Sequence, residues 1–528
     1  MRDTIPRGTP PGDVVTAALR AEGIDTIFGI VGSHVVGVYD ALRRHPGIHR
    51  VSLRHEGTVS FAAAVWARLT GQVGVAIVTA GPGVLNALNG LAQAQFSGWP
   101  LLLLAGGPPR GASAFDLHGL VDEDYSRRTV APLVKQAKRV EDIDALAELL
   151  AEAFFVARSG RPGPVYVEIP LDLFSAGTAR PLGYAPQGLE SGDCSTESIN
   201  TARKLLSAAT NPLVVIDRGA ADGAARREAL ALAETSGAAL VVTRDALGAV
   251  DTRHPRFLGT LHEHWFGDSA FRALMASDVC VVLGADEDSA NRQRVRSQAA
   301  GAVHFLHAGG ARDARCLEAG EVAPDAPALD ADTGPGDSNV FVAALQAIAA
   351  RLDEDSISVV DAGNHEVWAR TLLPIRHRHH CIGGADWASM GFALPAAIAA
   401  RVAFPGRRVL CVSGDGCLLM SLADLSTLFE AGGPTLLLLL NDSEYGMMTD
   451  VQNAQFGAAC ESALPRVDFV ALARSLGGSG TRVDDGGRLD EAVASALESE
   501  RPHVLEIVTE RPDIAALRRA PVIRTSQH

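Results

Sequence analysis

The sequence predicts an α/β protein made of three doubly wound parallel-sheet domains. Short apolar runs alternate with helical patterns along the chain, and two stretches rich in Gly, Pro, Ser or Asp interrupt this alternation. Strands that are buried on both faces read as continuous apolar runs, which is typical of parallel sheets covered by crossover helices. A chain of 528 residues is also too long for one hydrophobic core, so several domains are expected.

The first domain is predicted for residues 1–178. Its strands are expected in the runs DTIFGIVG, HPGIHRVSL, GQVGVAIVTAGPG, WPLLLLAGG and GPVYVEIPLD. The stretch Ala179–Ser195 is rich in Gly, Pro and Ser and has no hydrophobic period, so it is predicted to be a linker.

The second domain is predicted for residues 196–321 and the third for residues 338–528, with a linker at Val322–Asp337. In the second domain, strands are expected in NPLVVIDRG, GAALVVTRD, ASDVCVVLGAD and GAVHFLHAGG. In the third domain they are expected in SISVVDAGN, RRVLCVSGDG, PTLLLLLND and RPHVLEIVTE.

Charge and composition exclude several classes of protein. The formal net charge is −15 and no cluster of Lys and Arg occurs, so we expect no nucleic-acid partner. The N-terminus lacks the apolar segment of a signal peptide and the longest apolar runs are far shorter than a membrane span, so no membrane partner is expected. Seven cysteines without a CxxC pair indicate reduced thiols and a cytoplasmic location.

A possible metal site follows two predicted strands. Gly414-Asp415-Gly416 comes directly after the run VLCVS, and the next strand ends in Asn441-Asp442. Magnesium prefers oxygen ligands, and ligands bind at the carboxyl ends of parallel strands. Gly and Asp also occur at strand ends for purely conformational reasons, so this motif alone leaves a structural role open. The run His377–His380 is expected to be a solvated strand edge rather than a metal site.

Three further motifs stand at expected strand ends. Arg54-His55-Glu56 opens an alanine-rich helical stretch, where Glu56 could simply favour the positive end of the helix dipole. The segment GGADWASMGFALPAA contains Met390, which alone is more often core filler. The segment DAGNHEVWA around Gly363 could be a plain strand-end turn that caps the next helix.

Together these motifs resemble the thiamine-diphosphate-dependent enzymes of the acetolactate synthase, benzaldehyde lyase and oxalyl-CoA decarboxylase group. The likeness extends over nearly the whole chain, including TAGPGVLNALNGLAQA and SGRPGPVYVEIPLDL. It implies that magnesium binds Asp415, Asp442 and the backbone carbonyl of Glu444. Asp442 replaces the commoner Asn but remains an oxygen ligand.

The resemblance also implies roles around the cofactor. Glu56 would hydrogen-bond the aminopyrimidine ring and promote its imino tautomer, so that the ring amine becomes a base for the thiazolium C2 proton. Met390 would hold the cofactor in a V shape, with the Ala388 carbonyl and the Met390 amide on the aminopyrimidine. Ala388 stands where glycine is usual. The full cofactor-binding set implied is Gly363, Asn364, His365, Ala388, Met390, Gly414, Gly416, Cys417, Ser443, Tyr445 and Gly446.

Two histidines are further catalytic candidates. His34 lies in GIVGSHVVGVYD, where benzaldehyde-lyase-like sequences also carry His, and His118 lies in DLHGLVDED, where related enzymes carry Gln. Imidazole titrates near neutral pH, so either side chain could relay a proton to or from the substrate oxygen. A structural role stays open for both.

The expected rim of the substrate pocket bears on the acceptor. It includes Tyr445, Met448 and Trp387, with no Arg or Lys that could hold a second carboxylate, unless Lys135 or Arg110 reaches in. This rim favours an uncharged acceptor.

The resemblance therefore implies a carboligase that takes a 2-oxo acid donor and forms a 2-hydroxyketone, of the acyloin or acetolactate type. A 2-oxo acid decarboxylase, a 2-hydroxyketone lyase and a non-catalytic cofactor-binding homologue remain alternatives. The implied cofactors are thiamine diphosphate and Mg²⁺, and FAD is not expected because the second domain has no distinctive flavin motif. A homodimer or homotetramer with active sites between subunits is expected.

Overall fold

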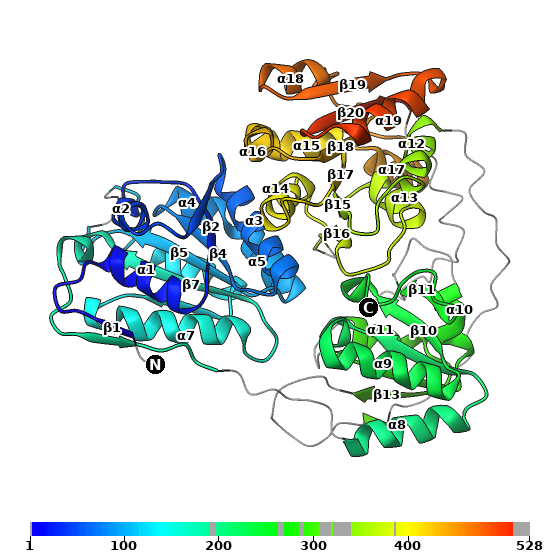
Figure 1. The fold of residues 1–528 in the computed structure, drawn as a ribbon, viewed down its shortest axis with the longest axis horizontal. Coiled ribbons are helices and arrows are strands. Elements are labelled where there is room, and N and C mark those ends of the chain that lie inside the picture. Colours follow the sequence, from blue (N-terminus) through cyan, green and yellow to red (C-terminus); the bar gives the residue numbers. More distant parts are fainter. Residues whose placement is uncertain are drawn as a thin grey trace.

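The computed structural model describes residues 3–113, 115, 117–188, 196–261, 269–285, 290–306, 318–319, 339–384 and 387–510. The linker predicted at 322–337 lies outside these residues. Figure 1 shows three α/β units: the N-terminal unit in blue and cyan, the central unit in green, and the C-terminal unit in yellow to red. Each unit contains one six-stranded sheet, so the predicted three-domain α/β class is confirmed.

The N-terminal domain has a fully parallel sheet with the strand order β3-β2-β4-β5-β7-β6. Its strands are β2 (Thr26–Gly29), β3 (His49–Ser52), β4 (Gly74–Val78), β5 (Leu101–Gly107), β6 (Gln136–Arg139) and β7 (Pro164–Pro170). Its helices are α1 (Pro11–Ala21), α2 (Val36–Arg44), α3 (Glu56–Thr70), α4 (Pro82–Asn86), α5 (Leu88–Ser97), α6 (Tyr125–Val130) and α7 (Leu146–Arg158).

One strand lies where the sequence predicts only linker. β8 (Leu182–Tyr184) pairs antiparallel with β1 (Asp3–Ile5) in a separate two-stranded sheet. Leu182 and Tyr184 are buried in the same apolar cluster as Ile5, while Gly183 between them is exposed. This alternation over three residues is too short to be recognised against a Gly- and Pro-rich background.

The central domain has the strand order β11-β10-β9-β12-β13-β14, parallel except for the antiparallel edge pair β13 and β14. Its strands are β9 (Pro212–Ile216), β10 (Ala239–Thr243), β11 (Phe257–Leu261), β12 (Val279–Leu283), β13 (Ala302–Leu306) and β14 (Glu318–Ala319). Its helices are α8 (Thr196–Ala208), α9 (Gly223–Ser236), α10 (Ser269–Ala276) and α11 (Ala290–Gln298).

The C-terminal domain has a parallel sheet with the order β16-β15-β17-β18-β20-β19. Its strands are β15 (Ile357–Val360), β16 (His380–Gly383), β17 (Val409–Gly414), β18 (Thr435–Asn441), β19 (Ser479–Val483) and β20 (His503–Val508). Its helices are α12 (Val340–Ala349), α13 (Asn364–Leu372), α14 (Ala393–Ala403), α15 (Asp415–Ser421), α16 (Leu425–Ala431), α17 (Gly446–Phe456), α18 (Phe469–Ser475) and α19 (Leu489–Glu498).

The N- and C-terminal domains pack through α3 and α14. Both helices are rich in fully buried alanines, which let their backbones approach closely, and the rings of Phe61 and Phe392 meet edge to face at 5.8 Å between centroids. Asn89 on α5 donates to Ser389 at 2.8 Å, and the Arg54 amide donates to Asp424 at 2.8 Å. The motif loops of both domains are therefore fixed relative to one another within the chain.

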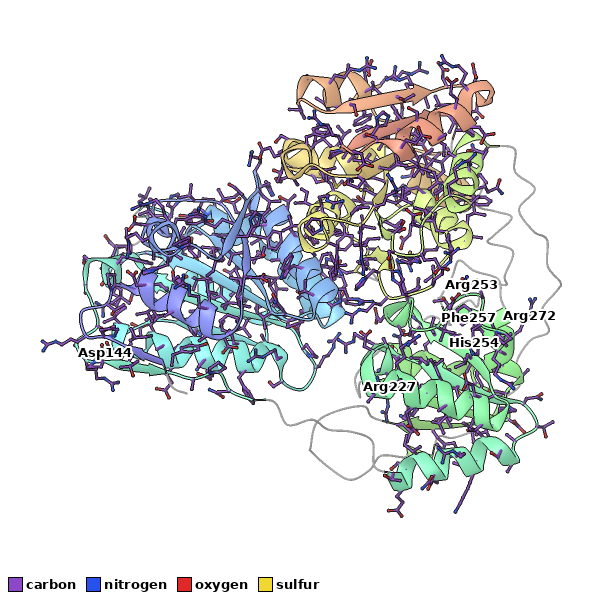
Figure 2. All side chains as sticks on the ribbon, in the orientation of Figure 1. Asp144, Arg227, Arg253, His254, Phe257 and Arg272 are labelled. Atoms are coloured by element: carbon purple, nitrogen blue, oxygen red, sulfur yellow. The ribbon has the colours of Figure 1, made fainter. Side chains whose placement is uncertain are left out.

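The central domain contacts the C-terminal domain through ion pairs. Figure 2 shows Arg253 on the side of the central domain that faces the C-terminal domain, and its Nη1 lies 3.5 Å from Glu354. Arg244 pairs with Glu366 in the same way. The run His377–His380 lies at this boundary too. The expectation of a solvated edge is wrong for His380, which begins β16 and is 3 % exposed.

Candidate active site

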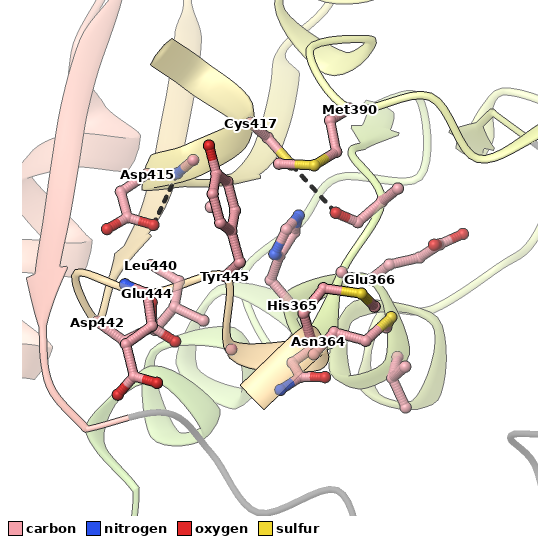
Figure 3. A pocket seen from close by; sticks show the side chains of 18 of the residues that line it. Asn364, His365, Glu366, Met390, Asp415, Cys417, Leu440, Asp442, Glu444 and Tyr445 are labelled. Atoms are coloured by element: carbon pink, nitrogen blue, oxygen red, sulfur yellow. Dashed lines mark hydrogen bonds between the residues drawn. The ribbon is translucent and has the colours of Figure 1, made fainter. Parts of the chain in front are cut away.

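A cavity of about 660 Å³ lies at the carboxyl ends of β15, β17 and β18. These strands are neighbours in one parallel sheet, so the loops that follow them meet at one edge. Figure 3 shows Asp415, Asp442 and Glu444 grouped on one side of it and Met390 and Cys417 on another. The predicted residues that line the cavity are Gly363, Asn364, His365, Ala388, Met390, Gly414, Asp415, Gly416, Cys417, Asp442, Glu444, Tyr445 and Gly446.

Asp415 and Asp442 form the acidic part of the wall. Asp415 Oδ1 accepts from the Gly416 amide at 2.7 Å, and Oδ2 accepts from the Ser443 amide at 2.9 Å. The predicted residue Ser443 does not line the cavity but contacts the Asp415 carboxylate in this way. Burial raises the pKa of Asp415 to about 6. Burial and then the charge of Asp415 raise the pKa of Asp442 to about 7. Two buried carboxylates that disfavour each other's ionised form are suited to a cation.

Side chains alone do not complete a metal site. Within the described part of the chain, no group of three or more His, Cys, Asp or Glu side chains could hold a metal ion. The Oε2 atom of Glu444 accepts from the Thr449 hydroxyl at 2.8 Å. The remaining oxygens would have to come from a diphosphate or from water, as magnesium sites usually require.

The turn that carries Met390 has an unusual backbone. Ala388 has φ 49° and Gly391 has φ 81°. A left-handed conformation costs an L-residue about 1 kcal/mol or more, so glycine would fit the position of Ala388 with less strain. Asp361, at the end of β15, holds the turn because its carboxylate accepts from the amides of Phe392 and Ala393, both at 3.2 Å.

His365 stands between the two glycine-containing loops. A Cβ on either Gly363 or Gly414 would come within about 3.0 Å of its ring, so both positions require the absence of a side chain. Its Nε2 is buried and has no hydrogen-bond partner among the described residues. Burial lowers the pKa of His365 to about 4, so the ring is neutral at pH 7 and carries a single N–H.

Two arginines also line the cavity, which the sequence does not predict. Arg244 comes from the central domain, in a short 3₁₀ turn after β10, and Arg370 comes from α13. Both donate to the same oxygen, Oε1 of Glu366, Arg370 at 2.9 Å through Nε. Each arginine side chain is only 7 % exposed.

Methionines form much of the apolar wall. Four of the six methionines of the chain, Met390, Met420, Met447 and Met448, line this one cavity. Met420 and Met448 are 57 % and 49 % exposed. Thioether side chains fill irregular space and adapt to different ligands.

The three catalytic candidates lie in the N-terminal domain. Glu56 begins α3, and its Oε2 accepts from Asn86 Nδ2 at 2.9 Å. His34 and His118 meet edge to face with ring centroids 5.1 Å apart. His34 is 1 % exposed, and burial together with the nearby His118 lowers its pKa.

The chain does not bring these candidates to the large cavity. None of the described residues of the N-terminal domain lines it. The two basic residues considered for the rim lie elsewhere as well: Arg110 pairs with Asp172, and Lys135 donates to the carbonyl of Ser159. The predicted site residues thus form two separate groups within one chain.

Sequence reasoning missed several cavity residues for different reasons. Glu366 and Met447 lie in the first turns of α13 and α17, which begin at the cavity, so the predicted helix starts could have indicated them. Arg244 has no local signal, because it reaches the cavity only through the docking of another domain.

Comparison with known families identifies the fold. The family model described as thiamine pyrophosphate enzyme, N-terminal TPP binding domain, matches residues 11–127, and the corresponding central-domain model matches residues 199–310. The C-terminal TPP binding domain model matches residues 361–507. The chain belongs to the thiamine pyrophosphate enzymes. Thiamine pyrophosphate is another name for thiamine diphosphate, so the predicted family and cofactor are confirmed.

This thiamine pyrophosphate enzyme is similar over almost its whole length to acetolactate synthases. It is 30% identical to the acetolactate synthase large subunit of Parasynechococcus marenigrum, with 94% of this chain and 86% of the relative covered. It is also 30% identical to the acetolactate synthase isozyme 2 large subunit of Escherichia coli, with 93% and 94% covered. It therefore belongs to the acetolactate synthase group and acts on carbon–carbon bonds. Among the described residues, none of its helices is both long and apolar enough to cross a bilayer.

Proposed function

We propose that this enzyme is a magnesium-dependent carboligase of the acetolactate type. One cavity combines a carboxylate pair suited to Mg²⁺ with two arginines suited to a substrate carboxylate, and this combination carries the proposal. The C1–C2 bond of a 2-oxo acid donor breaks and CO₂ leaves. The electron pair of that bond ends in a new bond to the carbonyl carbon of the acceptor, whose oxygen takes up a proton to give a 2-hydroxyketone.

The loops of the C-terminal domain would hold the cofactor. Asp415, Asp442 and the Glu444 carbonyl would bind Mg²⁺ together with the diphosphate, and the neutral ring of His365 would lie beside them. Backbone groups of Ala388 and Met390 would hold the aminopyrimidine. The bound cofactor supplies a carbon nucleophile that stabilises the negative charge left by decarboxylation.

The N-terminal group would supply proton transfer. Glu56, held by Asn86, would donate to or accept from the aminopyrimidine ring. His34 and His118 would exchange the proton of the acceptor oxygen, and the lowered pKa keeps His34 neutral near pH 7 and able to accept.

We place these two groups in one site across a subunit boundary. Within one chain, Glu56 lies outside the wall of the cavity that contains Asp415. A homodimer or homotetramer that joins the N-terminal domain of one chain to the C-terminal domain of another would complete the site. A cytoplasmic location and the lack of a flavin requirement stay predictions from the sequence.

The arginines favour a charged acceptor. The sequence argument for an uncharged acceptor assumed that no Arg or Lys lies at the pocket, and this assumption is wrong for Arg244 and Arg370. The two guanidinium groups share the single carboxylate of Glu366, so one positive charge is left over, and this charge would favour a carboxylate on the acceptor. The donor carboxylate leaves as CO₂, so tight binding of that group would stabilise the ground state and slow its loss. The acceptor carboxylate persists, which makes it the better partner.

Product analysis tests the proposal. With thiamine diphosphate, Mg²⁺ and pyruvate alone, we expect acetolactate as the dominant product by chromatography. Free acetaldehyde with every acceptor would indicate a decarboxylase, and an acyloin with added aldehyde but no acetolactate would restore the uncharged acceptor. In Arg244→Gln, the KM for a 2-oxo acid acceptor should rise about tenfold or more, while the rate with an aldehyde acceptor changes much less.

A second test concerns Glu56. Glu56→Gln keeps the shape and removes the acid, so the cofactor should still bind while proton exchange at the thiazolium carbon slows by orders of magnitude. Wild-type exchange in the variant would contradict the role given to this residue, whatever the products are.

A further inference from the structure

A second, much smaller cavity lies where all three domains meet. Its volume is about 30 Å³. Its charged lining comes from Arg68 on α3, Arg244 and Asp245 after β10, and Arg370 on α13. A cavity of this size holds one or two water molecules or one small ion, because a single water needs about 10–15 Å³ on the same scale.

Arg68 has a buried donor at this junction. Its Nη2 donates to the Arg378 carbonyl at 3.1 Å, and Arg378 donates back to the Arg68 carbonyl. Nη1 of Arg68 is also buried, and it has no hydrogen-bond partner among the described residues. A buried guanidinium N–H without an acceptor is costly, so this position favours a ligand that accepts.

The charge of the lining is positive. Three guanidinium groups face this cavity with one carboxylate, Asp245. Glu366, on the wall of the large cavity, accepts from both Arg244 and Arg370, so the three guanidinium groups exceed the two carboxylates by one positive charge. Burial and the charge of Arg378 lower the pKa of Arg68 to about 10, which still leaves it protonated at pH 7.

We propose that this cavity is a binding site for one small monovalent anion of halide size, such as chloride, which joins the three domains. A volume of about 30 Å³ matches one ion of this size. The site adjoins the cofactor cavity through Arg244 and Arg370 but has its own lining from the N-terminal domain, and the inference stands whether or not the proposed reaction is correct.

The anion would act on the large cavity through Arg370. This side chain lines both cavities and holds Glu366 on the wall of the larger one. An anion that accepts from Arg68 and Arg370 links α3 of the N-terminal domain to α13 of the C-terminal domain. Its removal should therefore loosen the junction and, less strongly, the loop that begins α13.

Bromide in a crystal of the full chain tests the site directly. We expect an anomalous difference peak between Arg68 and Arg370, within hydrogen-bonding distance of Arg68 Nη1, after soaking in sodium bromide. Electron density that fits a water molecule and has no anomalous difference peak at this position would overturn the proposal.

Thermal unfolding tests it in solution. At constant ionic strength, replacing sodium gluconate by sodium chloride should raise the Tm of the wild-type protein by about 2 °C or more. Arg68→Gln should remove most of this increment, and Arg68→Lys should retain part of it. Arg158→Gln is the matched control, because Arg158 is a half-buried N-terminal-domain arginine paired with Glu22, away from the cavity. Equal halide dependence in Arg68→Gln and Arg158→Gln would refute the site, and the bromide crystal decides the matter if Arg68→Gln does not fold.

Discussion

At the scale of single residues, Asp415 and Asp442 illustrate how burial prepares a cation site. Each carboxylate ends a strand of the central part of one sheet, and each is held in a low-dielectric wall with a like charge nearby. Ionising both carboxylates there is unfavourable without a cation, so a bound magnesium ion would complement the proposed site.

Asp415→Ala should therefore abolish magnesium-dependent retention of thiamine diphosphate. We expect the affinity to fall at least about 100-fold, while the fold persists because the side chain ends a strand and fills no core. Titration of the cofactor with and without Mg²⁺ measures this. Glu22→Gln is a suitable control, since Glu22 is a buried carboxylate paired with Arg158 and Tyr184 far from the cavity. Undiminished binding in Asp415→Ala would remove it from the metal site.

The same carboxylates predict a pH dependence of stability. The pKa of Asp415 rises from 3.8 to about 6 in the folded state, and that of Asp442 rises from 3.8 to about 7. The stability linked to a raised pKa is complete below the unfolded value and is lost as pH rises through the folded value. The Tm of the metal-free protein should thus fall between about pH 4 and pH 7 by more than that of Asp415→Asn. Thiamine diphosphate with Mg²⁺ should reverse the fall, and a parallel pH profile in the variant would contradict this account.

At the scale of elements, the sequence predicts which loops lie together when they follow neighbouring parallel strands. The loops after β15, β17 and β18 follow apolar runs that are visible in the sequence, and parallel strands place their carboxyl ends at one edge. The predicted cofactor residues Gly363, Asp415 and Asp442 therefore line one cavity, whereas β16, which precedes Met390, is not predicted from an apolar run. Arg244 does not follow from such a pattern, because its position depends on how two domains dock.

Asp361 joins three segments of the C-terminal domain, and the sequence does not predict this role. Its fully buried carboxylate joins the end of β15 to the start of α14 and to Ser413 at the end of β17, at 3.2–3.3 Å. These three segments frame the turn that carries Met390. Asp361 serves as a hydrogen-bond acceptor for these segments. In the sequence, the run DAGNHE looks like any strand end, so this role cannot be read from it.

Asp361→Asn should consequently weaken cofactor binding without altering the cofactor's direct ligands. An amide in place of the carboxylate loses charge and turns one acceptor into a donor beside backbone N–H groups, so we expect affinity to fall about tenfold. Glu22→Gln should lose comparable stability but bind the cofactor normally. Ser413→Ala removes only the weakest contact and should give an intermediate affinity. Equal cofactor affinity in all three variants would show that the turn is held by other contacts.

At the scale of the whole molecule, the division of the candidate site between two domains is the main constraint. Glu56 lies outside the cavity that contains Asp415, although α3 and α14 pack tightly within the chain. Tight packing of these helices prevents a simple hinge motion that would bring the two groups together. Two chains arranged around a twofold axis could join them, since each chain offers one copy of both groups.

Mixing of two inactive variants tests this arrangement. Glu56→Gln and Asp415→Ala each inactivate a different half of the site. If the halves come from different chains, a mixed dimer contains one site with both changes and one site with neither. Random exchange makes about half of the dimers mixed, so activity should return to about one quarter of the wild-type value per subunit. If both halves come from the same chain, every site carries one change and no activity returns. Analytical ultracentrifugation at the assay concentration accompanies the assay, because a fully active monomer would exclude a shared site independently.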